Sequence, residues 1–550
     1  MDESRAGHGS RPQPQAQPQP GTRDSPTDHI SSLPDDLLLQ VLAHLDDARA
    51  AARTTLLSRR WIGLFSHLPG VDVTLCDVPL GSLEDALRRA AGPGVRLIDI
   101  AVPAQEPPAP CGQDGGAVVA AASAVSAVLR EATSLSPAKL RFALPPELTL
   151  SPAHRFVAVD LPSFHRTTSI DLRAPPHIPL IHSQASTGFP LLESLSLSGY
   201  RIDLAALIPR CPRLRMLTVD FAVQSFSRAA RARGGADFAV QSLSLQGLVV
   251  HRSGMPTCRI VVQAPVLKRL TMSFIASREL SVSIVAPILE KVSWRCSYAS
   301  VVQGLGLWRL LEVSLETAEG HRRWAGCSDA YTGQDACSGL PGVNVLSLRM
   351  CCAKGSSGFP DGEIEFVPEI SKHMVTDFSR LELHLTSSGH GFGSFVWHLL
   401  GTHHIRNATR SLRIVLLRSE EREACRPNCR CDGPRNWRTQ PVYLPNLGKL
   451  EIEGFEGEDQ EFDFLKLVFR RARNLTRVTV RLPDQVTPND DWCTKLHNIF
   501  MAYPSVDANV DFIPGSFMCC RFLVCLAWVL DMPIVHTKLA YFSPAFCPFR

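Results

Sequence analysis

Three cysteines in the C-terminal third of the chain, Cys425, Cys429 and Cys431, are spaced closely enough to place sulfur ligands around one metal ion. A structural zinc site takes four Cys or His ligands, commonly supplied as closely spaced pairs. No Cys-x2-Cys pair follows these three cysteines. The ligand count therefore favours thiols in a polar loop over a zinc site, and we expect no metal and no cofactor.

The sequence contains no motif typical of an enzyme active site. Gly304-Leu305-Gly306 lacks the third glycine and the strand–helix context of a dinucleotide-binding loop. There is no Gly-x-Ser-x-Gly elbow, Walker loop or His-Glu-x-x-His motif. Carboxylate pairs such as Glu420-Glu421 lie in polar runs that are typical of a solvated surface. We expect no catalytic residues, and a chain that is not itself an enzyme.

Composition limits the partners and the compartment. The chain has 550 residues, of which 45% are hydrophobic, and its formal net charge of +4 creates no strong basic field for nucleic acid. Its 17 cysteines are scattered and odd in number, and no signal-peptide pattern opens the chain. We therefore expect thiols in a reducing compartment, cytoplasmic and/or nuclear. The apolar run 517–535 is interrupted by Arg521 and Asp531, so its uncharged part is far shorter than the roughly 20 residues of a membrane-spanning helix, and no membrane is expected.

Helical signals concentrate after the Pro/Gln-rich residues 1–27, which cannot bury enough apolar area to order themselves. Pro34 and the two following aspartates suit the start of a helix, and the apolar positions from Leu37 to Leu45 fall on one stripe. A second helical stretch begins near Ala48 and ends at Pro69-Gly70. So small a unit buries little surface by itself. From the pattern alone, a docking unit and a helical cap on the following domain are equally compatible.

Residues 28–69 resemble the F-box of plant F-box proteins in both halves. The first half reads Ile-Ser-Ser-Leu-Pro-Asp-Asp-Leu-Leu-Leu-Gln-Val-Leu-Ala-His-Leu, and the second reads Arg-Thr-Thr-Leu-Leu-Ser-Arg-Arg-Trp. Thr55 and Leu56 stand where the family usually has Ser and Val, and Phe65 stands where Trp is common. The resemblance implies contact with a Skp-type adaptor through Leu33, Pro34, Leu37, Leu38, Val41, Leu42, Leu45, Leu57, Ser58 and Trp61.

Segments of the form Leu-x-x-Leu-x-Leu, or close variants, recur through the rest of the chain. Their middle Leu or Val stands at 195, 217, 243, 270, 292 and 313, at steps of 21 to 27 residues, within the roughly 20–29 residues of leucine-rich repeats. Alternate residues of each short strand point inward, and neighbouring strands must stack to bury that face. Residues 70–440 therefore predict an irregular leucine-rich-repeat solenoid, or horseshoe, with insertions in its later repeats. The alternative is a generic α/β protein with Leu-rich strands.

Residues 441–512 resemble the FBD region that follows the repeats in many plant F-box proteins, starting from Leu444-Pro445-Asn446-Leu447. We expect the order strand, turn, amphipathic helix, strand, and this α/β unit would close the open end of the solenoid. The buried stripe of the helix is expected to consist of Phe464, Leu465, Val468 and Phe469. Residues 513–550 match no pattern and stay unassigned.

The fold class expected is thus α/β: a short helical F-box, an irregular solenoid and a C-terminal capping unit. The resemblances imply a substrate-recognition subunit of a Skp–cullin–F-box ubiquitin ligase. The F-box would bind the adaptor, the adaptor would link to a cullin–RING core, and the repeats would hold a protein substrate. One alternative is a repeat scaffold that engages partners without delivering them for ubiquitination. Another is a repeat protein with a degenerate F-box that binds a partner or small ligand.

Overall fold

The computed structural model describes residues 30, 33–45, 53, 54, 56–58, 60, 61, 64, 70–89, 95–104, 115–145, 158–181, 188–220, 236–252, 256–303, 307–318, 343–352, 366–387, 389–418, 429, 431, 435–483 and 490–512. The segments 1–27 and 513–550 and the thiol of Cys425 lie outside the described residues. Among the helices that are described, none has the length and apolar character needed to cross a membrane.

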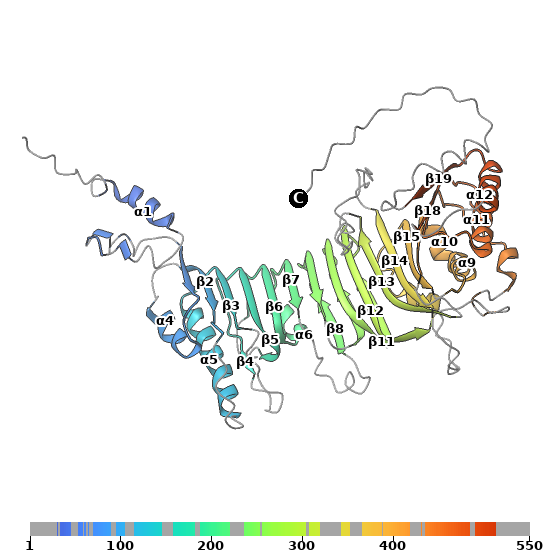
Figure 1. Cartoon of the computed structure of the whole chain (residues 1–550). Coiled ribbons are helices and arrows are strands. Elements are labelled where there is room, and N and C mark those ends of the chain that lie inside the picture. Colours follow the sequence, from blue (N-terminus) through green and yellow to red (C-terminus); the bar gives the residue numbers. More distant parts are fainter. Residues whose placement is uncertain are drawn as a thin grey trace, which may run out of the picture.

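The fold is mixed α/β and is dominated by one large sheet that runs along the molecule (Figure 1). Within the described residues, 19 strands belong to this sheet. The principal row follows chain order from β1 to β19 and leaves out β4, β8 and β10. Strand β4 pairs with the C-terminal end of β5. Strand β10 pairs with the C-terminal end of β11 on one side and with β8 on the other. The strands are β1 (Val71–Leu75), β2 (Val95–Ala101), β3 (Lys139–Ala143), β4 (Val159–Asp160), β5 (Ser169–Ile181), β6 (Ser194–Arg201), β7 (Met216–Asp220), β8 (Ala236–Gln241), β9 (Gly247–His251), β10 (Thr257–Gln263), β11 (Arg269–Val285), β12 (Lys291–Gln303), β13 (Trp308–Thr317), β14 (Asn344–Cys352), β15 (Arg380–Ser387), β16 (Ser411–Arg418), β17 (Lys449–Glu453), β18 (Arg477–Leu482) and β19 (Asp507–Phe512).

Parallel pairing aligns the apolar positions of successive strands into buried columns. A single strand cannot bury its face alone, so stacking like residues side by side creates one continuous core. From β2 to β12 one column consists of Ile98, Leu140, Ile170, Leu195, Leu217, Leu248, Leu270 and Val292. From β14 to β18 another consists of Leu346, Leu381, Leu412, Leu450 and Val478.

One predicted repeat position, Leu243, is wrong. Its side chain lies between β8 and β9 and is 84% exposed. Leu248 takes the place in the column instead, paired with Leu217 on one side and Leu270 on the other. The alternation of buried residues does not continue from β8 into β9, because a bend at Leu243 and Ser244 separates the two strands. The hydroxyl of Ser244 donates to the backbone carbonyl of Leu214, 30 residues earlier in the chain, at 2.9 Å.

Strand β13 interrupts the parallel order. It carries the predicted Val313 and Leu315 into the core, yet it runs antiparallel to both β12 and β14. A parallel neighbour requires a crossover of a dozen or more residues, whereas an antiparallel neighbour needs only a short loop. Only a few residues join β12 to β13, so the chain turns back at this point instead of crossing over.

Most helices lie toward the two ends of the sheet, and the short helix α6 (Leu204–Leu207) lies beside its middle near β7 and β8 (Figure 1). The long helix α5 was not expected from the sequence; its buried face is built from small or β-branched residues such as Ala122, Val125 and Val128, which give a weak signal. The helices are α1 (Asp35–Ala43), α4 (Leu83–Arg89), α5 (Gly115–Ser134), α6 (Leu204–Leu207), α8 (Phe366–Ser371), α9 (Gly393–Gly401), α10 (His403–Ala408), α11 (Asp459–Arg471) and α12 (Asp490–Met501), with 3-10 turns η1 (Leu80–Ser82), η2 (Ile208–Arg210) and η5 (Arg435–Thr439).

The C-terminal part has the expected order of strand, turn, helix and strand in β17, α11 and β18. All four residues of the expected stripe on α11 are buried: Phe464, Leu465, Val468 and Phe469. Phe464 meets Phe392 and Trp397 edge-on, with ring centroids 5.4 and 6.3 Å apart. Such edge contacts between aromatic rings add to the hydrophobic burial that holds α11 against α9 and the sheet.

Candidate functional site

The N-terminal helix α1 is held at its start by an arginine from the second helical segment. Arg60 donates from Nε and Nη2 to Oδ1 of Asp35 at 2.8 and 2.6 Å, and from Nη2 to the carbonyl oxygen of Leu33 at 2.6 Å. Pro34 precedes the first helical turn in an extended conformation. The Arg60–Asp35 pair is exposed, so it contributes at most about 1 kcal/mol. The pair joins the start of α1 to the second segment.

One face of α1 forms a small core with the second segment. Leu38 and Leu42 pack with Trp61 and Leu64 in a cluster separate from the sheet core, and all four side chains are at most 6% exposed. Leu33, Leu39 and Leu45 cover the edges of this cluster. Three of the ten residues expected to touch an adaptor, Leu38, Leu42 and Trp61, therefore serve inside the helical unit.

The adjacent face of α1 presents apolar side chains to solvent. Leu37 is 43% exposed and Val41 is 49% exposed, and the two lie one helical turn apart. Leu57 is 68% exposed on the second segment, and Leu56 and Ile30 are also exposed. Pro34 and Ser58, which complete the expected set, are exposed as well. We call Leu37, Val41 and Leu57 the outer apolar residues.

The predicted adaptor-binding residues thus divide into two groups with different physical roles. Leu38, Leu42 and Trp61 fix the angle of the helices, with Leu33 and Leu45 at the edge. Pro34, Leu37, Val41, Leu57 and Ser58 are available for contact. Full burial of an apolar side chain such as Leu or Val contributes roughly 1.5–3 kcal/mol. The outer apolar residues can therefore bind a partner with a complementary apolar groove.

A second surface lies on the face of the sheet opposite α9 and α11. Charged residues of β15 to β19 follow one another there: Arg413 lies 4.0 Å from the buried Glu382 and 2.8 Å from Glu453, and Arg481 lies 2.5 Å from Glu451. Arg481 also lies 3.9 Å from Asp511 on the last strand. Sequence reasoning described only the apolar positions of these strands and missed this charged row. Its charges alternate in sign, so it suits a polar protein surface better than a polyanion.

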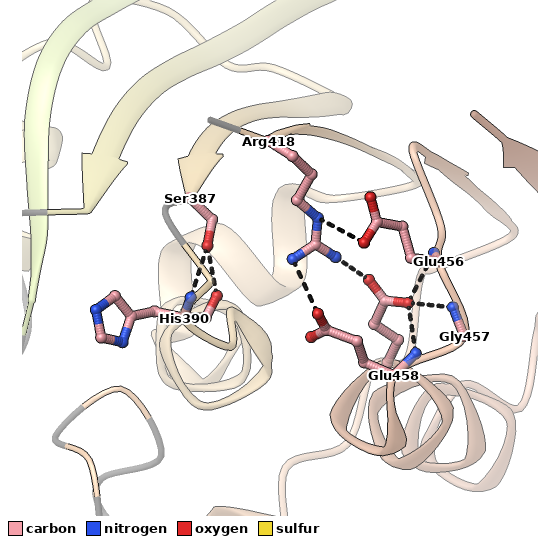
Figure 2. A network of polar contacts seen from close by, with 7 residues as sticks. Ser387, His390, Arg418, Glu456, Gly457 and Glu458 are labelled. Carbon is pink, nitrogen blue, oxygen red and sulfur yellow. Dashed lines mark hydrogen bonds and ion pairs between the residues drawn. The ribbon is translucent and has the colours of Figure 1, made fainter. Parts of the chain in front are cut away.

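The turn before α11 is organised around a buried carboxylate (Figure 2). Glu461 is 1% exposed, and its Oε2 accepts the backbone N–H groups of Glu456, Gly457 and Glu458 at 2.9, 2.7 and 3.1 Å. Arg418, at the end of β16, donates to the other oxygen of Glu461. Burial raises the pKa of Glu461 to about 7, although Arg418 acts in the opposite direction. This network locks α11 to β16.

A buried polar chain joins β12 to α8. Trp294 donates from Nε1 to Nδ1 of His373 at 3.1 Å, and Nε2 of His373 lies 2.6 Å from the hydroxyl of Tyr298. The Tyr298 hydroxyl in turn donates to Glu369 at 3.0 Å. His373 is fully buried, and that burial lowers its pKa to about 3, assisted by the charge of Lys372. The imidazole is therefore neutral, and its role is to link the two elements.

Two of the three cysteines considered for metal binding lie beside a histidine from a distant segment. Sγ of Cys429 is 3.3 Å from Nδ1 of His390, and Cys431 completes a group whose candidate ligand atoms all lie within 4.8 Å of one another. Sequence reasoning missed His390 because it lies 39 residues away from Cys429 in the chain. The only signal in the sequence is the pair of flanking glycines, Gly389 and Gly391, which is typical of a turn.

Comparison with known proteins gives a partial similarity. No protein-family model matches the chain. An F-box/FBD/LRR-repeat protein of Arabidopsis thaliana is 38% identical over 60 residues, which is 11% of this chain. The chain matches 13% of the length of that relative. At most, this similarity supports a relation to plant F-box/LRR proteins and suggests a role in protein interaction.

Proposed function

We propose that this chain is the substrate-recognition subunit of a Skp–cullin–F-box ubiquitin ligase. The outer apolar residues would dock on a Skp-type adaptor, and the adaptor would connect the chain to a cullin–RING core. The chain itself would perform no chemistry. It would hold a protein substrate near the ubiquitin-charged enzyme and so raise the effective concentration of the substrate there.

The observation that carries this proposal is the division of α1 into two apolar faces. An ordinary cap would turn its apolar residues toward the domain that it covers. Here Leu38 and Leu42 are satisfied inside the helical unit, while Leu37 and Val41 remain 43% and 49% exposed. A soluble chain that keeps such residues in water on one short helix has a surface suited to an apolar partner.

For the remainder of the chain we propose an irregular leucine-rich-repeat solenoid closed by an FBD-like unit. The buried columns of aligned Leu, Ile and Val residues support this, because each turn of a repeat contributes one strand to a shared core. The alternating charges on β15 to β19 support the same part of the chain as a surface for a polar protein substrate. Residues 70–440 and 441–512 are the proposed extents of the two regions.

The test is binding of the full chain to a purified Skp-type adaptor by isothermal calorimetry. We expect Leu37→Asp/Val41→Asp to weaken binding by about a hundredfold or more, because two apolar contacts are lost and two charges must be desolvated. Gln40→Asp adds a charge to the exposed surface of the same helix and is the matched control. Equal binding of the double variant and the control would contradict docking through α1.

Delivery of a substrate needs a separate measurement. If the chain binds the adaptor, its loss in cells should slow the turnover of at least one bound protein, and restoring Leu37→Asp/Val41→Asp should fail to rescue that turnover. Unchanged turnover of every bound protein would favour the scaffold alternative. That outcome would leave adaptor binding intact and remove only the delivery step.

A further inference from the structure

The cluster of His390, Cys429 and Cys431 brings together three side chains that bind soft metal ions. His390 follows β15 in the turn before α9, and the two cysteines precede η5. In tetrahedral zinc sites with sulfur at about 2.3 Å and nitrogen at about 2.0–2.1 Å, neighbouring S and N atoms lie about 3.5 Å apart and two sulfurs about 3.8 Å apart. The Cys429–His390 separation of 3.3 Å already matches that edge. The upper limit of 4.8 Å for the group requires a contraction of at most about 1.3 Å if it is the S–N distance of Cys431 and His390, and of at most about 1 Å if it is the S–S distance.

The position of His390 is fixed by its own neighbours. The hydroxyl of Ser387 accepts from the backbone N–H of His390 at 3.0 Å and donates to its carbonyl at 2.7 Å. Gly389 has φ +100°, a conformation that favours glycine, and a Cβ at Gly391 would lie 1.5 Å from Oε1 of Gln460. Figure 2 shows the consequence: the main chain of His390 is pinned to Ser387, and its ring points away from Arg418.

The segment that carries the cysteines is anchored separately. Cys431 is 3% exposed, and the η5 turn after it places Trp437 fully in the core. The Trp437 ring rests directly on Gly393 at the start of α9, where an added Cβ would lie 2.7 Å from it. Both ligand-bearing segments are therefore attached to the same helix, which keeps the three side chains within reach of one ion.

From this geometry we propose that His390, Cys429 and Cys431 bind a zinc ion through Nδ1 and two thiolates. Binding releases the two thiol protons to solvent, because sulfur coordinates zinc as thiolate. Two thiolates and one divalent cation give a neutral group, which removes the electrostatic penalty of burying a charge beside Cys431. Three protein ligands leave the fourth tetrahedral position open to water or to a ligand atom from a partner.

The site would act as a cross-link. It joins the turn between β15 and α9 to the segment before η5. The η5 turn is itself tied to α11, because Arg438 donates to Asp463 at 2.7 Å. A metal that binds only the folded chain stabilises it by mass action. Zinc would therefore stiffen the region that connects the repeat strands to the C-terminal unit.

The experiment uses the full chain, purified with a phosphine reductant and titrated with cobalt and then with zinc. We expect a single tightly held metal ion per chain, with a thiolate-to-cobalt charge-transfer absorption that zinc displaces. Loss of an outer hydrogen-bond partner commonly weakens metal binding by roughly 10–100-fold. Ser387 bonds to the main chain of His390 and not to its ring, so Ser387→Ala should weaken metal binding by less than that, whereas His390→Gln and Cys429→Ser should weaken it by more than about 100-fold. The matched control is Cys351→Ser, which removes another half-buried thiol outside the cluster and should bind zinc unchanged.

A second readout on the wild-type chain keeps the test decisive if a variant fails to fold. Zinc should protect Cys429 and Cys431 from alkylation, measured by peptide mass spectrometry with and without a chelator. The proposal is overturned if alkylation of both cysteines is unaffected by zinc, if cobalt gives no charge-transfer band, or if Cys351→Ser alone removes the metal. A Cys429–Cys431 disulfide persisting under the reductant would also overturn it.

Discussion

Arg418 and Glu461 form a buried ion pair across 43 residues of chain. The arginine ends β16 and the glutamate occupies the first turn of α11, with side chains 10% and 1% exposed. Arg418 also lies 3.8 Å from Glu456 and 3.5 Å from Glu458. One cation thus lies against three carboxylates at the start of α11.

Removing that cation should destabilise the C-terminal unit. We expect Arg418→Met to lower the free energy of unfolding by about 3–5 kcal/mol, because it leaves a buried carboxylate without its partner. Arg477→Met is the control: its pair with Asp507 is more than half exposed on both sides, and we expect a loss of under about 1 kcal/mol. Denaturant unfolding monitored by tryptophan fluorescence measures both. Similar losses in the two variants would contradict the role given to burial.

The raised pKa of Glu461 predicts a pH dependence. The folded pKa of about 7 exceeds the ordinary value of 4.5, so between these values the folded state binds more protons than the unfolded state. Its contribution to stability is then full below about pH 4.5 and declines as the pH rises to 7. Relative to Glu461→Gln, which cannot titrate, the wild type should lose stability over this window. Parallel pH profiles of the two proteins would contradict the shift.

His373 predicts the opposite slope. Its pKa is lowered from 6.5 to about 3, so at intermediate pH the unfolded state binds the proton and the folded state does not. From pH 6.5 to pH 5 the wild type should lose about 2 kcal/mol through this residue. His373→Phe should already be less stable at pH 7, by about 1–3 kcal/mol, because Trp294 and Tyr298 lose their partner. The difference between the two proteins should shrink toward pH 5; a constant difference would contradict the prediction.

The two faces of α1 should respond differently to the same substitution. Leu38→Asp places a charge in the cluster with Trp61, so we expect the helical unit to unfold and adaptor binding to be lost with it. Leu37→Asp changes a side chain that is 43% exposed, so binding should weaken while the helix content by circular dichroism stays unchanged. Loss of helix content in Leu37→Asp would show that this face is structural.

Gly454 is required at the turn that precedes α11. It has φ +80°, and an added Cβ would lie 2.4 Å from the carbonyl oxygen of Leu416. We expect Gly454→Ala to cost at least about 2 kcal/mol, from the left-handed backbone and the contact together. Gly81→Ala is the control, since nothing lies within 4 Å of its added Cβ. Equal melting temperatures of these two variants would contradict the prediction.

Much of the fold could be predicted from apolar spacing. The alternation that marked Leu195, Leu217 and Leu270 holds in the sheet, because each strand exposes one face to a shared core. The spacing failed at Leu243, since a bend between strands is invisible to a leucine count. It also gave no strand direction, so the reversal at β13 was not foreseen.

The candidate sites were less predictable because they depend on contacts between distant segments. A helical stripe includes Leu37 and Leu38 alike, and only the packing of Trp61 decides which of them is buried. Counting ligands near Cys429 could not include His390, which approaches through the folding of β15 against β16. The Arg418–Glu461 pair arises in the same way, from a strand end and a helix start that meet only in the folded chain.

The reversed strand β13 also has a bearing on how the chain folds. Every parallel neighbour must wait for a crossover to close, and loop closure over longer distances is entropically slower. The β12–β13 pair closes locally and buries Trp294 and Leu315 directly opposite each other. We therefore expect this hairpin to form a nucleus near the middle of the sheet, to which β11 adds in parallel beside β12 and β14 adds antiparallel beside β13.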